Sequence, residues 1–202
     1  MAQQEQRMMA DPYFSIDYQA QVNLCPLADG ETVPDADTLE AEIPAPFKLI
    51  SEVTRIDTNN ARLLRNLDEH AADLVEIINL QSRKIDLVLS YVLAGEDNPE
   101  QRHHTLSLGG GGFTFVSQQP LAEGCSVRFK LFLPELSVAV YGYGQIQADR
   151  PADTEPTHYR CQFSALREQD RDALIRASLQ LQAKQLKARA ERRAQQDGPT
   201  AS

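Results

Sequence analysis

Few residues of this 202-residue chain have the types and spacing that support chemistry. The most conspicuous is the run Gly109–Gly112, because consecutive glycines can wrap around a phosphate group. The run does not fit a phosphate loop, since no Gly-Lys-Ser/Thr follows it and the next residues, Phe113-Thr-Phe-Val, indicate a strand rather than the start of a helix. We therefore expect neither a mononucleotide nor a dinucleotide loop here.

Histidines and cysteines are the remaining candidates, as metal ligands or as a nucleophile with its base. The candidate metal ligands are His103, His104, His158 and Cys161. Their spacing matches no metal site, and adjacent histidines on a strand point to opposite faces. Cys125 or Cys161 with His158 would form a nucleophile–base pair, but a buried cysteine acting as a small apolar residue is favoured. We expect no metal, no cofactor and no enzyme.

Composition bounds the class of protein. The formal net charge is −9, 42% of residues are hydrophobic, and no stretch approaches the roughly 20 apolar residues of a membrane span. A pI near 4.9 argues against a general binder of nucleic-acid polymers. The first residues lack the pattern of a secretory signal, and three widely spaced cysteines suit free thiols in a reducing compartment. A cytoplasmic protein is expected.

The net charge is unevenly distributed along the chain. Residues 1–45 carry one base and nine acids, whereas residues 166–202 carry eight bases and five acids. The stretch 28–45 is rich in Asp, Glu and Pro and has no base, so we expect a loosely held acidic linker. Alternating apolar residues over 14–24 predict a half-buried first strand.

A change to helical periodicity follows over residues 46–95, which contain no Pro after Pro46 and no Gly before Gly95. Heptad columns started at Val53 give a wide apolar stripe, which predicts one long coiled-coil helix with more than two strands. The residues expected at the oligomer interface are Val53, Ile56, Asn60, Leu63, Leu67, Leu74, Ile77, Gln81 and Val88.

Two features of this helix leave alternatives open. Instead of one rod, the segment could form two shorter helices broken near Thr58-Asn59-Asn60. Asn60 and Gln81 could set the register by pairing with their own copies, or could lie near a frayed or solvated edge.

After residue 96 the pattern changes to short strands separated by turns. The expected strands are 102–108, 113–117, 126–133, 137–148 and 157–163. With the first strand they suffice for a small antiparallel barrel, and residues 166–194 then predict a terminal helix. Its basic end could bind an acidic partner or the acidic linker of its own oligomer, although a solvated helix end is favoured.

The motif Thr105-Leu-Ser107-Leu-Gly-Gly110 resembles the second motif of PilZ domains, Asp/Asn-x-Ser-x-x-Gly. The turn ending at Gly124, the strand end Leu131–Pro134 and the entry Phe163–Leu166 into a helix fit the same order. A first strand and a long helix placed before the motif are similar to the atypical, tetramer-forming PilZ branch.

This resemblance implies an α+β fold, a six-stranded antiparallel PilZ-like barrel with a long inserted heptad helix and a C-terminal helix. Typical members receive cyclic di-GMP through an Arg-x-x-x-Arg pair. That pair is absent, Thr105 replaces Asp/Asn, and the barrel segment is acidic, which argues against tight binding. Ser107 and Gly110 are carried over as candidate ligand contacts, and Arg102 is added for its proximity.

The expected organisation is an N-terminal segment with the first strand (1–27), the acidic linker (28–45), the oligomerisation helix (46–95), the barrel (96–165), the C-terminal helix (166–194) and a disordered tail (195–202). The resemblance implies a non-enzymatic adaptor in cyclic di-GMP-linked motility, adhesion or virulence control, acting as a homotetramer with a further protein partner. The alternative is a direct cyclic di-GMP receptor with a non-standard site.

Overall fold

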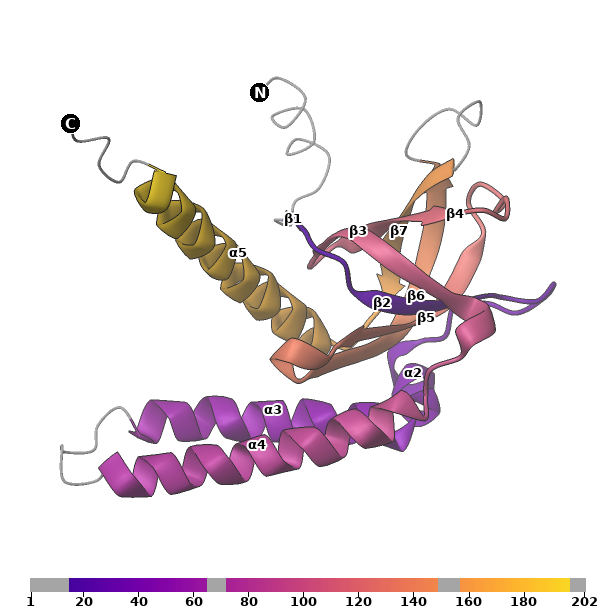
Figure 1. The fold of residues 1–202 in the computed structure, drawn as a ribbon. Coiled ribbons are helices and arrows are strands. Elements are labelled where there is room, and N and C mark those ends of the chain that lie inside the picture. Colours follow the sequence, from indigo (N-terminus) through magenta and orange to yellow (C-terminus); the bar gives the residue numbers. More distant parts are fainter. Residues whose placement is uncertain (1–14, 65–71, 149–156, 197–202) are drawn as a thin grey trace.

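The computed structural model describes residues 15–64, 72–148 and 157–196, with a barrel from which helices extend on one side (Figure 1). The strands are β1 (Ser15–Asp17), β2 (Gln21–Pro26), β3 (Arg102–Gly109), β4 (Gly112–Ser117), β5 (Ser126–Leu133), β6 (Val138–Ala148) and β7 (Thr157–Ala165). The helices are α2 (Ala36–Glu42), α3 (Ala45–Leu64), α4 (Ala72–Ala94) and α5 (Glu168–Gln196), with 3₁₀ turns η2 (Pro99–Gln101) and η3 (Pro134–Leu136).

The sheet is antiparallel throughout and closes on itself. Its order is β1-β3-β2-β5-β6-β7-β4, and an additional β3–β4 pairing joins the two sides into a barrel. Closure gives the outermost strands hydrogen-bond partners. Alternate residues such as Val127, Phe129 and Leu131 are fully buried in the interior. The predicted six-stranded α+β barrel is confirmed, with strand bounds close to those expected.

The expected first strand, residues 14–24, is present as two short strands, because β1 and β2 pair with successive parts of β3. The Thr105 hydroxyl bridges the interruption: it donates to the Tyr18 carbonyl over 2.6 Å and accepts from the Ala20 amide over 2.9 Å. The side chain thus satisfies backbone groups that an irregular strand would leave unpaired.

The segment expected to be a loosely held linker is largely ordered, so that interpretation is wrong for residues 36–43. Asp35 caps α2 by accepting from the Thr38 amide over 2.9 Å. Leu39 and Ile43 are buried against the outer face of the barrel. Two apolar residues four apart suffice to anchor this short helix, although its other residues are exposed and three of them are acidic.

The predicted single helix over 46–95 is wrong, because α3 and α4 lie side by side as an antiparallel pair, here called the hairpin (Figure 1). The Ser82 hydroxyl donates to the Asp57 carboxylate over 3.2 Å, although the two residues are 25 apart in sequence. In one straight helix they would be about 37 Å apart. The alternative of two helices is correct, but not its break near Thr58-Asn59-Asn60, because α3 continues to Leu64.

Two apolar cores hold the parts together. The first fills the barrel and is closed by α5 through Leu174, Ala177 and Leu181. The second joins the hairpin and α2 to the outer face of β5 and β6, where Phe47 is fully buried between the rings of Phe132 and Tyr141. Burial of such side chains contributes roughly 1.5–3 kcal/mol each, which fixes the base of the hairpin on the barrel.

The predicted C-terminal helix is present as α5, and it begins at Glu168 and continues to Gln196. Residues 195 and 196, expected in a disordered tail, are its last residues, and the rest of that segment lies outside the described residues.

Candidate functional site

Ser107, the serine of the glycine motif, is buried in the middle of the sheet. It lies opposite Thr114 in the β3–β4 register, and the two hydroxyl oxygens are 2.7 Å apart. Each hydroxyl therefore already has a hydrogen-bond partner within the barrel wall. The presence of a serine at position 107 is therefore explained by its hydrogen bond across the β3–β4 pair, without any contact to a ligand.

Gly110 lies just past the end of β3, where α5 reaches the barrel. Its carbonyl accepts a hydrogen bond from Arg171 Nη1 over 2.6 Å. At Gly112 a Cβ would lie 2.2 Å from the carbonyl oxygen of Cys161 on β7, a contact that no side chain can tolerate. The glycine run thus allows close approach of β4 to β7, as well as the turn between β3 and β4.

Arg102 begins β3, and its guanidinium is paired with Asp97. The two groups form a salt bridge, with Arg102 Nε also donating to Asp97 Oδ1 over 3.3 Å. Asn23 on β2 donates to the same carboxylate over 2.9 Å. Burial pushes the pKa of Asp97 upward, but the hydrogen bonds from Arg102 and Asn23 outweigh burial and lower it. The lowered pKa favours the ionised carboxylate, so Arg102 has a charged partner within its own chain.

The three candidate contacts do not meet in one site. Arg102 and Gly110 lie at opposite ends of an eight-residue strand, about 26 Å apart at the usual rise per residue, with Ser107 between them. Their side-chain or carbonyl groups are each engaged by a different neighbour. The arrangement therefore does not reproduce a clamp around one small ligand.

A polar depression of about 440 Å³ opens beside the first part of β3. Its lining is Gln19, Glu100, Arg102, His103, His104, Thr105, Leu106, Val116, Ser117, Gln118 and Gln119. Burial lowers the pKa of His103, a backbone hydrogen bond with Val116 opposes this shift, and the imidazole packs 5.4 Å from the Phe115 ring. Arg102 and Thr105 thus share a surface hollow that Ser107 and Gly110 do not line.

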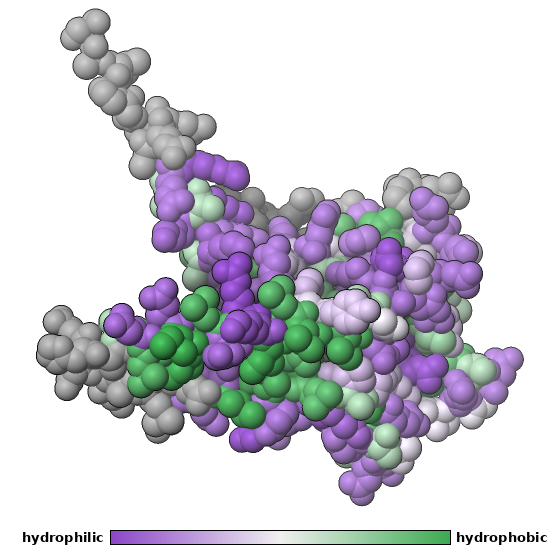
Figure 2. Space-filling model, turned by 60° about the horizontal axis from the view of Figure 1, so that its bottom comes forward, coloured by the Kyte–Doolittle hydropathy of each residue, from purple (hydrophilic) through white to green (hydrophobic). Residues whose placement is uncertain are grey.

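The hairpin carries the largest exposed apolar surface of the described residues. Its exposed members are Leu49, Ile56, Leu74, Ile77, Leu80, Ile85, Leu87, Val88, Tyr91 and Val92, here called the hairpin stripe. Figure 2 shows apolar side chains gathered on the underside of the hairpin, facing solvent. Val88 is 63% exposed and Tyr91 is 83% exposed, values unusual for apolar residues of an ordered helix.

The predicted interface residues divide between several environments. Leu74, Ile77, Gln81 and Val88 are exposed on α4, and Ile56 is exposed on α3. Val53 is half-buried against the second core. The side chains of Asn60 and Leu63 and the whole of Leu67 lie outside the described residues.

The face that α4 turns toward α3 differs from the heptad stripe. Leu89 and Leu93 fill this contact near the barrel, whereas farther out it contains Ser82 and Asp86. One carboxylate oxygen of Asp86 is buried without a hydrogen-bond partner. Pairing of α3 with α4 therefore uses a partly polar face and leaves the apolar heptad positions to solvent.

Sequence reasoning missed a buried ionic cluster where α3 meets α5. Arg167 Nε donates to Asp170 Oδ2 over 2.7 Å, and the Ser51 hydroxyl donates to Asp170 Oδ1 over 2.8 Å. Burial raises the pKa of Asp170, although Arg167 and Ser51 act in the opposite direction. The i, i+3 spacing of Arg167 and Asp170 is visible in the sequence, but Ser51 is not, since it lies 119 residues from Asp170.

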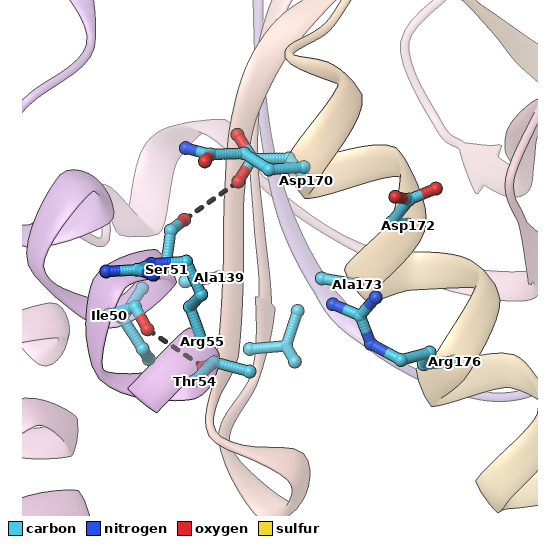
Figure 3. Close-up of a pocket in the computed structure, with 11 residues that line it drawn as sticks. Ile50, Ser51, Thr54, Arg55, Ala139, Asp170, Asp172, Ala173 and Arg176 are labelled. Atoms are coloured by element: carbon cyan, nitrogen blue, oxygen red, sulfur yellow. Dashed lines mark hydrogen bonds between the residues drawn. The ribbon is translucent and has the colours of Figure 1, made fainter. Parts of the chain in front are cut away.

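Figure 3 shows the cavity beside this cluster, between α3, β6 and α5, with a volume of about 200 Å³. Its floor is apolar, formed by Ile50, Val138, Ala139 and Ala173. The cavity separates the two helices outward from the cluster, so that α3 and α5 diverge as they leave the barrel (Figure 1).

The thiols show no arrangement for nucleophilic catalysis in the part of the chain described. Cys161 is fully buried in the barrel core, and burial raises the pKa of its thiol. His158 is three residues earlier on the same strand, so the two side chains point to opposite faces. The described ranges contain no group of three or more His, Cys, Asp or Glu side chains that could hold a metal ion. They also contain no helix long and apolar enough to cross a membrane.

A closed antiparallel barrel with an inserted helical pair and a capping C-terminal helix defines the class of this protein. The family model described as "PilZ domain" matches residues 81–180. Residues 81–180 therefore form a PilZ domain, the family that the glycine motif resembles. Comparison with curated proteins finds no match.

Solved structures that are similar to this chain include the following two. One is a pathogenic protein from Xanthomonas campestris, described as a new tetrameric PilZ domain self-assembled via an unusual helical bundle. Its sequence is 16% identical, and the TM-score is 0.53. The match covers 92% of this chain and 96% of that chain. The other is the Bacillus subtilis inhibitor of motility MotI/DgrA, 12% identical with a TM-score of 0.45 over 86% of this chain. This chain spans 52% of the MotI/DgrA chain.

Proposed function

We propose that this chain is a non-enzymatic, cytoplasmic PilZ adaptor that self-associates through the hairpin and acts in cyclic di-GMP-linked control of motility, adhesion or virulence. The single observation that carries the proposal is the hairpin stripe, an ordered apolar surface that the other described residues leave uncovered. A further protein partner would then bind the assembled barrels.

The position of the stripe supports a second copy as its occupant. Apolar residues on α4 follow the heptad spacing of a helical bundle, and they lie away from the face that contacts α3. Because the stripe spreads over neighbouring columns and continues onto α3 at Leu49 and Ile56, it is wide enough for more than one partner helix. The tetrameric, helical-bundle assembly of the Xanthomonas campestris protein is in keeping with this interpretation.

Light scattering combined with size-exclusion chromatography tests the proposal. The wild type should run as an oligomer, a tetramer in the favoured interpretation, at micromolar concentration. The variant Ile77→Asp/Val88→Asp should be monomeric. Burial of the exposed 56% of Ile77 and 63% of Val88 is worth about 2–3 kcal/mol per chain, and an unpaired carboxylate would oppose association further.

A matched control changes exposed positions outside the stripe on the same helix. Asn79→Asp/Arg83→Gln alters the net charge by the same −2 as the double Asp variant, and both residues are exposed. It should keep the wild-type mass. A monomeric wild type, or a double Asp variant that remains fully assembled, would refute self-association through the hairpin.

A second candidate is direct binding of cyclic di-GMP at a non-standard site, favoured by the polar depression that Arg102 and Thr105 line. Calorimetric titration with cyclic di-GMP, and with GTP as a control nucleotide, tests it. Binding that Arg102→Ala abolishes and His158→Ala, outside the depression, leaves unchanged would support this receptor. Absence of heat up to high micromolar ligand would refute the receptor function and leave the adaptor function as the remaining proposal.

A further inference from the structure

The last part of α5 projects from the molecule without tertiary support. Gln185 donates to the Asp17 carbonyl over 2.9 Å. In the described part of the chain, no side-chain hydrogen bond or ion pair joins residues 186–193 to another element. This part consists almost entirely of Ala, Lys, Arg, Gln and Glu, strong helix formers that can sustain a helix in solvent. Figure 1 shows it extending away from both the barrel and the hairpin.

Four cations lie on this projection. They are Lys187, Arg189, Arg192 and Arg193, all exposed and without an anionic partner among the described residues, and are here called the basic tip. Glu191 is the one acid among them. The cations are spread around the helix axis. Beside them the exposed large apolar side chain is Leu186, which by itself does not form an apolar face.

An acidic counterpart lies on the same chain at the other side of the molecule. It consists of Asp29, Glu31, Asp35 and Asp37, which are exposed and, within the described ranges, have no cationic partner; it is here called the acidic surface. Glu40, beyond it on α2, is already 3.5 Å from Arg167 and 3.7 Å from Lys48. The two opposite charge groups thus match in number.

The two groups cannot meet within one chain. The acidic surface precedes and begins α2, which is fixed to the outer face of β5 and β6 by Leu39 and Ile43. The start of α5 lies near α2, since Arg167 is 3.5 Å from Glu40. The basic tip lies at the far end of α5, about 30–40 Å along the helix axis, because each residue adds about 1.5 Å. Figure 1 shows α2 beneath the barrel and the last turns of α5 far from it, at the upper left.

We propose that the basic tip of one copy binds the acidic surface of another copy, as a second, ionic contact of the assembly. This inference rests on the proposed self-association, and it adds the partner surface for α5. In an oligomer held together by the hairpin, the basic tip of one copy is at a high local concentration near the acidic surface of another. Ion pairs that are weak between separate molecules can then form. Such pairs set orientation more than they add affinity, because each is worth little in water.

A second copy fits the tip better than nucleic acid or a lipid surface. A helix that lies on a membrane needs an apolar face, which the tip lacks. A nucleic acid would be repelled by the remainder of a chain whose formal net charge is −9. The acidic surface of this chain supplies the complementary charge without any added component.

The experiment compares assembly of two charge-matched variants by analytical ultracentrifugation at low salt and at 0.5 M salt. Lys187→Gln/Arg189→Gln/Arg192→Gln neutralises the tip and keeps helix propensity. Ala122→Glu/Gln145→Glu/Ser164→Glu makes the same charge change at exposed positions of the barrel outside the polar depression. The first should weaken association about tenfold at low salt, and the difference should vanish at high salt because the Debye length shrinks to a few ångströms. The second should behave as wild type.

Carbodiimide cross-linking locates the contact directly. A mixture of isotope-labelled and unlabelled wild-type chains should give hybrid cross-links from Lys187 to Asp29, Glu31 or Asp37. Assembly that is unaffected by neutralising the tip, cross-links confined to single chains, or a tip-dependent affinity for a labelled 20-nucleotide RNA would each overturn the proposal. A monomeric wild type would instead refute self-association itself, so the two failures are distinguishable.

Discussion

The buried pair of Arg167 and Asp170 should be the most costly ionic interaction to break in this protein. The Asp170 side chain is 2% exposed, and its carboxylate accepts from Arg167 at 2.7 Å and 3.0 Å and from Ser51 at 2.8 Å. Arg167→Met keeps the length and apolar stem of the side chain but removes the charge. Asp170 then remains buried with one hydroxyl donor instead of a bidentate cation.

The expected loss is about 3–5 kcal/mol in the free energy of unfolding at pH 7, the range for removal of one member of a buried pair. The loss should shrink in acid. Burial already raises the pKa of Asp170 above that of an unfolded carboxyl, and removal of Arg167 should raise it more. The folded state then binds a proton more readily than the unfolded state, so the penalty is full above the folded pKa and fades as pH falls toward the unfolded one.

Urea denaturation at fixed protein concentration, at pH 7 and pH 5, provides the measurement. Asp170→Asn, alone and together with Arg167→Met, completes a double-mutant cycle. The double variant should recover most of the stability lost in Arg167→Met, because no charge is then buried. A loss below about 1 kcal/mol in Arg167→Met, or a pH-independent loss without recovery in the double variant, would refute the assignment of a structural ion pair.

Two further predictions concern packing. Phe47→Ala should destabilise the fold by about 3–5 kcal/mol and release the hairpin from the barrel. Asn59→Ala, exposed on the same helix and outside the hairpin stripe, should change stability by less than about 0.5 kcal/mol. Thermal unfolding with hydrogen exchange of α4 measures both effects, and equal effects would contradict the second core. Gly112→Ala places a Cβ 2.2 Å from the Cys161 carbonyl and should cost about 2 kcal/mol or more by urea denaturation; wild-type stability would show that β4 and β7 separate freely.

Local patterns in the sequence were sufficient to predict the strands of the barrel. Strand positions follow from alternation and turn residues, both of which act over a few residues, so the five strands after residue 96 lie within a few residues of their predicted bounds. The glycine motif led to the PilZ family for the same reason, because Ser107 and Gly112 are set by the geometry of neighbouring strands.

The candidate site was less predictable. The motif residues were visible, but their partners are distant in sequence: Arg171 reaches Gly110 from 61 residues away. The cluster that joins Ser51 to Asp170 has no local signature at Ser51 either. Whether a polar side chain is available to a ligand depends on such partners, which only the folded chain brings together.

Heptad spacing, a property of the chain alone, predicts that residues 46–95 are helical and amphipathic. That the segment folds back as α3 and α4, with Phe47, Leu89 and Leu93 holding its base on β5 and β6, depends on contacts between distant residues and is seen only in the folded molecule. Likewise, part of the acidic stretch that was predicted to be a linker forms α2, because Leu39 and Ile43 are buried against the barrel. The physical reason is that periodicity reveals which residues avoid water, but not which surface will cover them.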